Sequence, residues 1–258
     1  MNDTRIIALT PENIENYGLC GYKNANKHVE LRNKFQWFEE YYPLGLRINA
    51  LVSENGGYQG MIEYIPGEYA HRPVKANNYL FIHCLFVGFN KQFKGEGHAT
   101  NLINDCIEDA QHQNKDGVAV VTRKGSFMAG KEVFLKNGFA IKDKSKPDFE
   151  LVAFKLKKDA PDPAFKDMEI LLSSFKDGLF IFRSVQCPYT EKNVNAILNT
   201  AREKYNLQPE LIDLNTHELA MNSPCPFGTF GIIYNGKIIS YHPISNTRFE
   251  NIMEKILN

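Results

Sequence analysis

The 258-residue chain contains 43% hydrophobic and 23% charged residues, which is typical of a globular protein and excludes a fibrous or disordered one. Thirty basic and thirty acidic side chains balance, so no overall charge favours binding to nucleic acid or anionic lipid. No basic segment leads into an apolar run near residue 1, and the apolar stretch near residues 80–89 is too short to span a bilayer. We therefore expect a cytoplasmic protein without a membrane or nucleic-acid partner.

The first half of the chain has the pattern of an α/β domain. Residues 5–9 predict a strand, and Thr10-Pro11-Glu12 has the residue types of a helix start. Apolar residues between about 27 and 42 predict one or two helices. Two strand-like runs, 47–53 and 58–65, flank an Asn-Gly-Gly turn and indicate a hairpin.

The next segment alternates buried strands with helices. Residues 79–87 are almost continuously apolar, which predicts a strand buried on both faces. Apolar residues then recur at helical spacing between 99 and 110. Further elements are expected as a strand at 117–123, a helix at 132–137 and a strand at 150–156.

A charged, proline-containing segment near residues 157–164 has the composition of a linker. Beyond it the pattern is strand, helix, strand, hairpin and helix, with Asn235-Gly236 as the hairpin turn. The predicted organisation is a first domain at 1–157, a linker at 158–175 and a second domain at 176–258.

The loop that starts the helix near residue 99 has the features of an anion site. Within Gln92-Phe93-Lys94-Gly95-Glu96-Gly97 the glycines let the backbone turn and approach a phosphate, and the helix start presents unpaired N–H groups. The same glycine pattern also occurs as a simple turn, and it lacks the third glycine of a dinucleotide-binding fold.

Two motifs carry a resemblance to a known family. Gln92-x-x-Gly95-x-Gly97 resembles the Gln/Arg-x-x-Gly-x-Gly/Ala signature of the GCN5-related N-acetyltransferase (GNAT) family. Residues 134–139, Phe-Leu-Lys-Asn-Gly-Phe, resemble the family's Tyr-x-x-Asn-Gly-Phe element. The resemblance covers residues 1–157 and implies a mixed central sheet flanked by helices.

The resemblance implies acetyl-CoA as co-substrate and a primary amine as acceptor. The backbone of residues 86–89 would pair with the pantetheine arm, and the N–H groups of residues 94–99 would hold the pyrophosphate. The implied coenzyme residues are Phe86, Val87, Phe89, Gln92, Phe93, Lys94, Gly95, Glu96, Gly97, His98, Ala99 and Asn137.

His83 is the candidate catalytic base, because some family members have a histidine or acid at this place and an imidazole accepts a proton near neutral pH. It is expected on the same strand face as Val87. A histidine in an apolar strand is also often a hydrogen-bonded core residue. Phe134 replaces the tyrosine that protonates the leaving thiolate in the family, so water or another residue donates that proton, or the domain binds acyl-CoA without turnover.

The second domain resembles a thioredoxin-like domain. Cys187-Pro188-Tyr189-Thr190 is similar to the CPYC motif of glutaredoxins with threonine for the second cysteine. Pro226 stands where that fold has its cis-proline loop. The two-domain arrangement is similar to that of bacterial acetyltransferases with a YoaP-type C-terminal domain.

Five cysteines without C-x-x-C spacing indicate thiols, and we expect no metal cofactor. At a helix N-terminus Cys187 would be reactive. Cys225 is expected to face it, close enough for a bridge or a shared soft ion; the alternative is a domain that has kept the fold without redox chemistry. A thiol-redox or thiol-binding protein acting through Cys187 is therefore an alternative function. The acceptor and the oligomeric state are left open.

Overall fold

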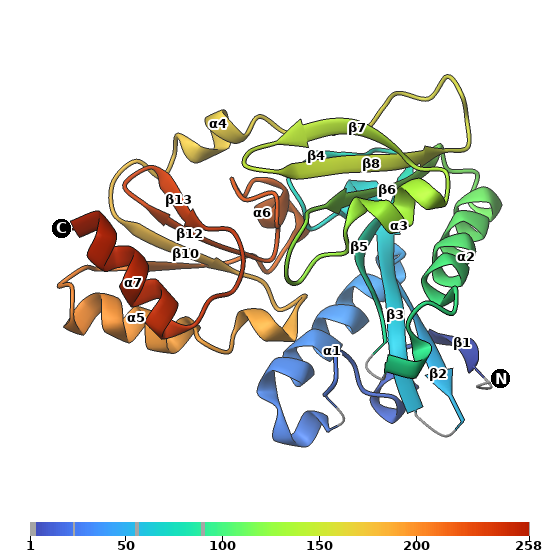
Figure 1. Cartoon of the computed structure of the whole chain (residues 1–258), viewed down its shortest axis with the longest axis horizontal. Helices are drawn as coiled ribbons and strands as arrows, with labels where there is room; N and C mark the ends of the chain where they lie inside the picture. The colour runs from blue at the N-terminus through green and yellow to red at the C-terminus, as the bar shows by residue number, and fades with distance from the viewer. Residues whose placement is uncertain (1–3, 23, 55–56, 89–90, 258) are drawn as a thin grey trace. The chain divides into compact units, whose positions relative to one another are not determined.

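The computed structural model describes residues 4–22, 24–54, 57–88 and 91–257 (Figure 1). The chain divides into two compact units. Unit 1 contains the chain up to residue 70 together with residues 74–165, and unit 2 contains residues 71–73 and the chain from residue 166 onward. Residues 158–165 therefore lie in unit 1, where their last two residues pair with a short strand.

Unit 1 is built on a seven-stranded sheet in the order β1-β2-β3-β5-β6-β8-β7. Neighbouring strands are antiparallel except for β5 and β6, which are parallel. The strands are β1 (Thr4–Leu9), β2 (Arg47–Ser53), β3 (Gly57–Pro66), β5 (Tyr79–Val87), β6 (Gly117–Thr122), β7 (Ala140–Ser145) and β8 (Phe149–Lys155). A separate two-stranded ladder joins β4 (Val74–Lys75) to β9 (Ala164–Phe165).

The described part of unit 1 contains three α-helices: α1 (Val29–Tyr41), α2 (His98–His112) and α3 (Lys131–Lys136). Single 3-10 turns occur at Ile14–Asn16, Ala25–Lys27, Tyr42–Leu44, Gly67–Tyr69 and Lys91–Phe93. The helix expected from Thr10 onward is wrong. The Thr10 N–H donates to the side-chain oxygen of Asn13, and the chain forms turns that end in the first 3-10 turn.

The two faces of the sheet have different coverings. A large apolar cluster packs α2 and α3 against one face, with Ile62 and Ile82 among its strand residues and Leu102 on α2. Side chains of the opposite parity on β3 and β5, including Glu63 and His83, contact α1 instead. Different helices therefore cover the two faces, and the face under α1 contains charged side chains.

Unit 2 is a four-stranded sheet in the order β11-β10-β12-β13. Strands β10 and β11 are parallel, whereas β12 is antiparallel to both β10 and β13. Its elements are α4 (Met168–Leu172), β10 (Leu179–Arg183), a 3-10 turn at Pro188–Thr190, α5 (Val194–Glu203), β11 (Glu210–Asp213), α6 (His217–Met221), β12 (Phe230–Tyr234), β13 (Lys237–Ser240) and α7 (Asn246–Leu257).

The expected Asn-Gly hairpin is present in unit 2. Asn235 and Gly236 both have positive φ, 46° and 75°, as a tight turn between twisted strands requires. The order of strands and helices is the one expected for the second domain, with α4 and α6 in addition. A mixed sheet with flanking helices, followed by a separate small α/β domain, confirms the predicted fold class.

Candidate functional site

The central feature of unit 1 is the separation of β5 from β6. The two strands pair in parallel only as far as Ile82 and Val120. Beyond that point β5 continues beside β3 to Val87, and β6 continues beside β8 to Thr122. Within the described ranges, the main chain of β5 from residue 83 onward therefore has one edge without a neighbouring strand. Such an edge can bind an extended ligand in the manner of an added strand.

A β-bulge at His83 changes which side chains of β5 share a face. The consecutive residues Glu63 and Tyr64 pair with β5 residues that are two positions apart, so His83 is an extra residue between them. His83 contacts Glu63, whereas Val87 packs against the apolar cluster beneath α2. The expectation that His83 and Val87 share a face is wrong, because the bulge interrupts the alternation of a regular strand.

Two glycines shape the loop that leads into α2. Gly95 and Gly97 have φ values of 84° and 82°, in the left-handed region that other residues rarely adopt. A Cβ atom at either position would meet no atom of the described residues within 4 Å, so the backbone here borders open space. Gly97 directly precedes α2. Because glycine has no side chain, none accepts a hydrogen bond from the first N–H groups of the helix at this position. The first-turn N–H groups and the positive end of the helix dipole are therefore available to an anion.

One side chain of this loop, Phe93, is buried, and the other described ones are exposed or half-buried. Phe93 is buried, with its ring 6.1 Å from that of His98, so it holds the loop in place. Lys94 is exposed and its carbon chain lies over Gly88, where a Cβ would come within 2.6 Å of Lys94 Cγ. The other described coenzyme candidates are exposed or half-buried: Phe86, Val87, Gln92, Glu96 and Ala99. Phe89 lies outside the described residues.

The second motif is tied to the first through Asn137. Its side-chain Nδ2 donates to Val133 O at 2.7 Å and to Thr100 Oγ1, in the first turn of α2, at 3.3 Å. Phe134 is fully buried in the cluster beneath α2 and α3, with its ring 5.4 Å from that of Phe139. Asn137 thus links α3 to the start of α2, and Phe134 is a core residue rather than part of an open site.

His83 belongs to a buried charged cluster of Lys34, Glu63 and His83. The His83 Nδ1 atom lies 3.2 Å from Glu63 Oε1, and the Lys34 ammonium is paired with Glu63 Oε2. The Lys34 ammonium also lies 4.1 Å from the centre of the Trp37 ring. Burial by itself raises the pKa of Glu63, but the charge of Lys34 and the hydrogen bond from His83 outweigh it and lower the pKa to about 2. Glu63 is therefore a carboxylate throughout the physiological range.

The His83 side chain is 0% exposed, and the rings of Trp37 and Phe81 lie 6.1 and 5.8 Å from it. An acceptor amine cannot contact the imidazole in this conformation. Sequence patterns singled out His83 but missed Lys34 and Glu63. The signal in Lys34 was its position within the apolar face of a helix, where a lysine is rarely buried unless it is paired.

The predicted thiol site of unit 2, at Cys187, does not lie at the N-terminus of an α-helix. Cys187 is half-buried and precedes a three-residue 3-10 turn, whereas α5 begins only at Val194. The expected position of Cys187 at the start of the helix is therefore wrong. Thr190, which replaces the second cysteine of the motif, is buried and its hydroxyl bonds Ser184 O at 2.7 Å and Cys187 O at 2.9 Å. The threonine closes the turn around Cys187.

The second predicted cysteine, Cys225, is buried. Its thiol lies 3.0 Å from Phe230 O in hydrogen-bond geometry, and a Cβ at Gly231 would come within 3.3 Å of the sulfur. The peptide bond between Cys225 and Pro226 is trans, so the expected cis-proline at this place is wrong.

Comparison with known proteins extends this description. Residues 210–251, within unit 2, match the model of a family described as YoaP-like. A Bacillus subtilis (strain 168) protein, named as the uncharacterized N-acetyltransferase YoaP, is 29% identical over 253 residues, which is 97% of this chain and 98% of that protein. The chain is YoaP-like. The similarity extends through both units, and the GNAT recognition made from the two motifs stands.

Solved structures of acetyltransferases resemble about three fifths of this YoaP-like chain. YncA of Salmonella typhimurium, solved with its cofactor acetyl-CoA, is 16% identical with a TM-score of 0.44, covering 62% of this chain and 99% of that one. YhbS of Escherichia coli, in complex with CoA, is 10% identical with a TM-score of 0.40, covering 64% and 91%.

The described helices include none that is both long and apolar enough to cross a membrane. Among the described residues, no group of three or more histidine, cysteine or acidic side chains is arranged to hold a metal ion.

Proposed function

We propose that this protein transfers an acetyl group from acetyl-CoA to a primary amine. The observation that carries the proposal is the loop of Gly95 and Gly97, whose open backbone leads to an uncapped start of α2 beside the edge where β5 leaves β6. The first-turn N–H groups would bind the pyrophosphate, and the open edge of β5 would pair with the pantetheine arm. Similarity to a named N-acetyltransferase over nearly the whole chain agrees with this reaction.

In the proposed reaction the neutral amine attacks the thioester carbonyl. A C–N bond forms, the C–S bond breaks, and coenzyme A leaves as a thiolate, while the amine loses one proton. Phe134 has no proton to give and is buried, so water protonates the thiolate. A thiol pKa of about 8.5 makes that thiolate an adequate leaving group.

His83 is retained as the proposed base, and its burial defines how it would act. The imidazole would have to receive the proton through an internal water or after α1 moves, because its side chain has no exposed surface. A His83→Gln variant is expected to bind acetyl-CoA normally and to lose turnover most strongly near neutral pH. If its turnover equals that of the unmodified protein at every pH, His83 is a structural residue only.

Calorimetry with acetyl-CoA tests the binding step, and release of free thiol with a panel of amines tests the transfer. Gly95→Val and Gly97→Val are expected to weaken coenzyme binding, because the left-handed backbone would change and side chains would enter the open space. Gly178→Val, at a positive φ in unit 2, is the matched control. Absence of any affinity for acetyl-CoA or coenzyme A would refute the proposal.

Two alternative functions are separated by the same measurements. Acetyl-CoA binding without thiol release for any amine would indicate a coenzyme-binding module. A thiol protein acting through Cys187 would lose its function in a Cys187→Ser variant, whereas the proposed transferase activity is expected to persist in that variant.

A further inference from the structure

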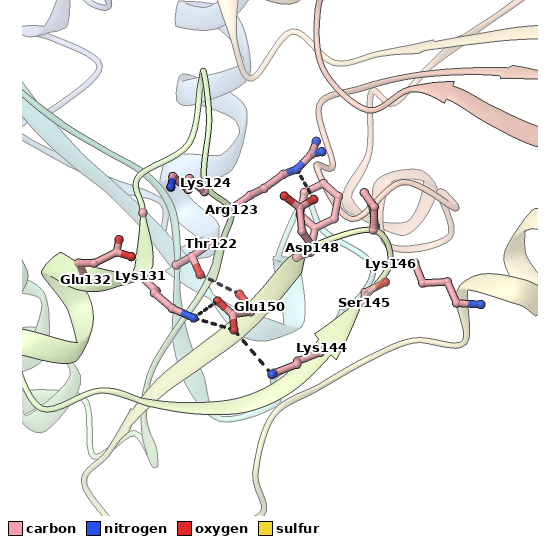
Figure 2. Close-up of a pocket in the computed structure, with 13 residues that line it drawn as sticks. Thr122, Arg123, Lys124, Lys131, Glu132, Lys144, Ser145, Lys146, Asp148 and Glu150 are labelled. Carbon is pink, nitrogen blue, oxygen red and sulfur yellow. Dashed lines mark hydrogen bonds and ion pairs between the residues drawn. The ribbon is translucent and has the colours of Figure 1, made fainter.

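A pocket of about 650 Å³ lies in unit 1 at the end of β6 (Figure 2). The start of α3 and the turn between β7 and β8 complete its wall. This volume is in the range of sites for small molecules. Its charged lining consists of five cations, Arg123, Lys124, Lys131, Lys144 and Lys146, and three acids, Glu132, Asp148 and Glu150.

Ion pairs within the pocket hold part of this charge in place. Arg123 Nε bonds Asp148 Oδ1 at 2.6 Å, and the Lys131 ammonium lies 2.7 Å from Glu150 Oε2. Glu150 is shared with Lys144, whose ammonium is 3.9 Å from it. One carboxylate thus faces two ammonium groups, and the pocket as a whole has two more positive than negative side chains.

Packing and hydrogen bonding order the wall of the pocket. The Arg123 guanidinium lies 4.8 Å from the centre of the Phe149 ring, and Phe149 itself is fully buried. The Thr122 hydroxyl bonds Glu150 O at 3.1 Å, which joins the end of β6 to β8. These contacts hold Arg123 and the ends of β6 and β8 in fixed positions at the wall, as a preformed site requires.

The pocket adjoins the proposed reaction centre. Thr122 is in the wall of the pocket, and it stands two residues after Val120, the last residue of β6 that pairs with β5. At a strand rise of about 3.3 Å per residue, the pocket begins roughly 7 Å along β6 from the point where the strands separate. A small bifunctional molecule can span that distance.

We propose that this pocket binds an anionic group of the acceptor, so that the acceptor is a primary amine with a carboxylate or phosphate. This inference rests on the proposed acetyl transfer. At neutral pH an alkylamine is a cation, and the excess positive charge repels it from the pocket. The acceptor therefore places its anionic end in the pocket and its amine toward the open edge of β5. Polyamines, which have no anionic group, are poor acceptors.

Matched pairs of amines test the proposal through free thiol release. 4-Aminobutyrate is compared with butylamine, and O-phosphoethanolamine with ethanolamine, which also distinguishes carboxylate from phosphate. In each favoured pair the amine that carries the anionic group is expected to have at least a tenfold higher kcat/KM. Equal values within both pairs, or a preference for the partners without an anionic group or for spermidine, would overturn the inference.

Charge-reversal variants test whether the lysines of the pocket cause the preference for an anionic group. Lys124→Glu and Lys146→Glu are expected to lower kcat/KM for the amine with the anionic group at least tenfold, while the KM for acetyl-CoA stays unchanged and the rate with butylamine does not fall. Lys136→Glu, an exposed lysine on α3 outside the pocket lining, is the matched control and is expected to have no such effect. A rise in the KM for acetyl-CoA instead would show that the pocket holds the coenzyme and would refute the inference.

Direct binding separates failure of the inference from failure of the proposed function. Calorimetry with O-phosphoethanolamine and with 4-aminobutyrate is done without acetyl-CoA. Binding that Lys124→Glu abolishes supports the anion pocket even if no amine is turned over. Turnover of amines that lack an anionic group, without anion binding, refutes the anion pocket and leaves the proposed transferase. Absence of both turnover and anion binding refutes both proposals.

Discussion

Glu63 on β3 and His83 on β5 meet in the interior of unit 1, with Oε1 and Nδ1 3.2 Å apart. The contact forms where the bulge at His83 lies, next to the last paired residues of β5 and β6. Lys34 of α1 completes the cluster through the second oxygen of Glu63. A buried ion pair rarely stabilises a fold more than apolar residues would, and perturbed ionisable groups gather at functional sites.

The first prediction concerns acid stability. The folded-state pKa of Glu63 is lowered to about 2, below its ordinary value of 4.5, so the carboxylate stabilises the fold above pH 4.5. This stabilisation is lost progressively as the pH falls from 4.5 toward 2. Urea unfolding of the unmodified protein and of Glu63→Gln should show a difference in unfolding free energy that shrinks over this window. A difference that is constant with pH would contradict the assignment.

The second prediction concerns Lys34. In Lys34→Met the Glu63 carboxylate stays buried without its main counter-charge, and we expect a loss of about 3–5 kcal/mol in the free energy of unfolding. The double variant Lys34→Met/Glu63→Gln removes that charge as well, so it should be more stable than the single variant. Denaturant melts measure both, with the exposed Lys136→Met as control. A loss below about 1 kcal/mol would show that the cluster is not held by this pair.

The third prediction compares two glycines in different surroundings. A Cβ at Gly60 would lie 2.3 Å from Phe86 O on the neighbouring strand, so Gly60→Ala must displace β5 and is expected to destabilise unit 1 by about 1–3 kcal/mol. The Cβ of Gly97→Ala would meet no described atom within 4 Å, and we expect only the roughly 1–2 kcal/mol cost of a left-handed backbone. Thermal melts compare the two. Equal coenzyme affinity in Gly97→Ala and the unmodified protein would count against the loop site.

The fourth prediction concerns the turn around Cys187. Thr190→Val keeps the shape of the side chain but removes the hydroxyl that bonds Ser184 O and Cys187 O, leaving buried carbonyls without this donor. We expect a loss of about 1–3 kcal/mol and faster alkylation of Cys187, because the turn opens. Thr190→Ser, which keeps the hydroxyl, is the control. Unchanged stability and alkylation in Thr190→Val would show that the hydroxyl does not hold the turn.

Local patterns were sufficient for most elements of the fold. The apolar run of β5, the helical spacing of α2 and the Asn-Gly turn between β12 and β13 each depend on neighbours within a few residues. Short elements were missed for the same reason: β4 and β9 have two residues each and exist only because they pair with one another across the chain. The turn at Thr10 was mistaken for a helix because a side chain three residues away competes for its N–H group.

The sequence by itself determined the glycine loop before α2, since Gly95 and Gly97 are adjacent to the helix they precede and their backbone freedom is a property of the residues themselves. Only the tertiary structure decided the surroundings of His83. Lys34, Glu63 and His83 come from three separate elements, and one inserted residue in β5 turned His83 toward the other two and away from the face of Val87. The same holds for the pocket at the end of β6, because its charges meet only when α3 and the β7–β8 hairpin pack beside that strand. Contacts between distant segments depend on packing of the whole domain, and no local pattern encodes them.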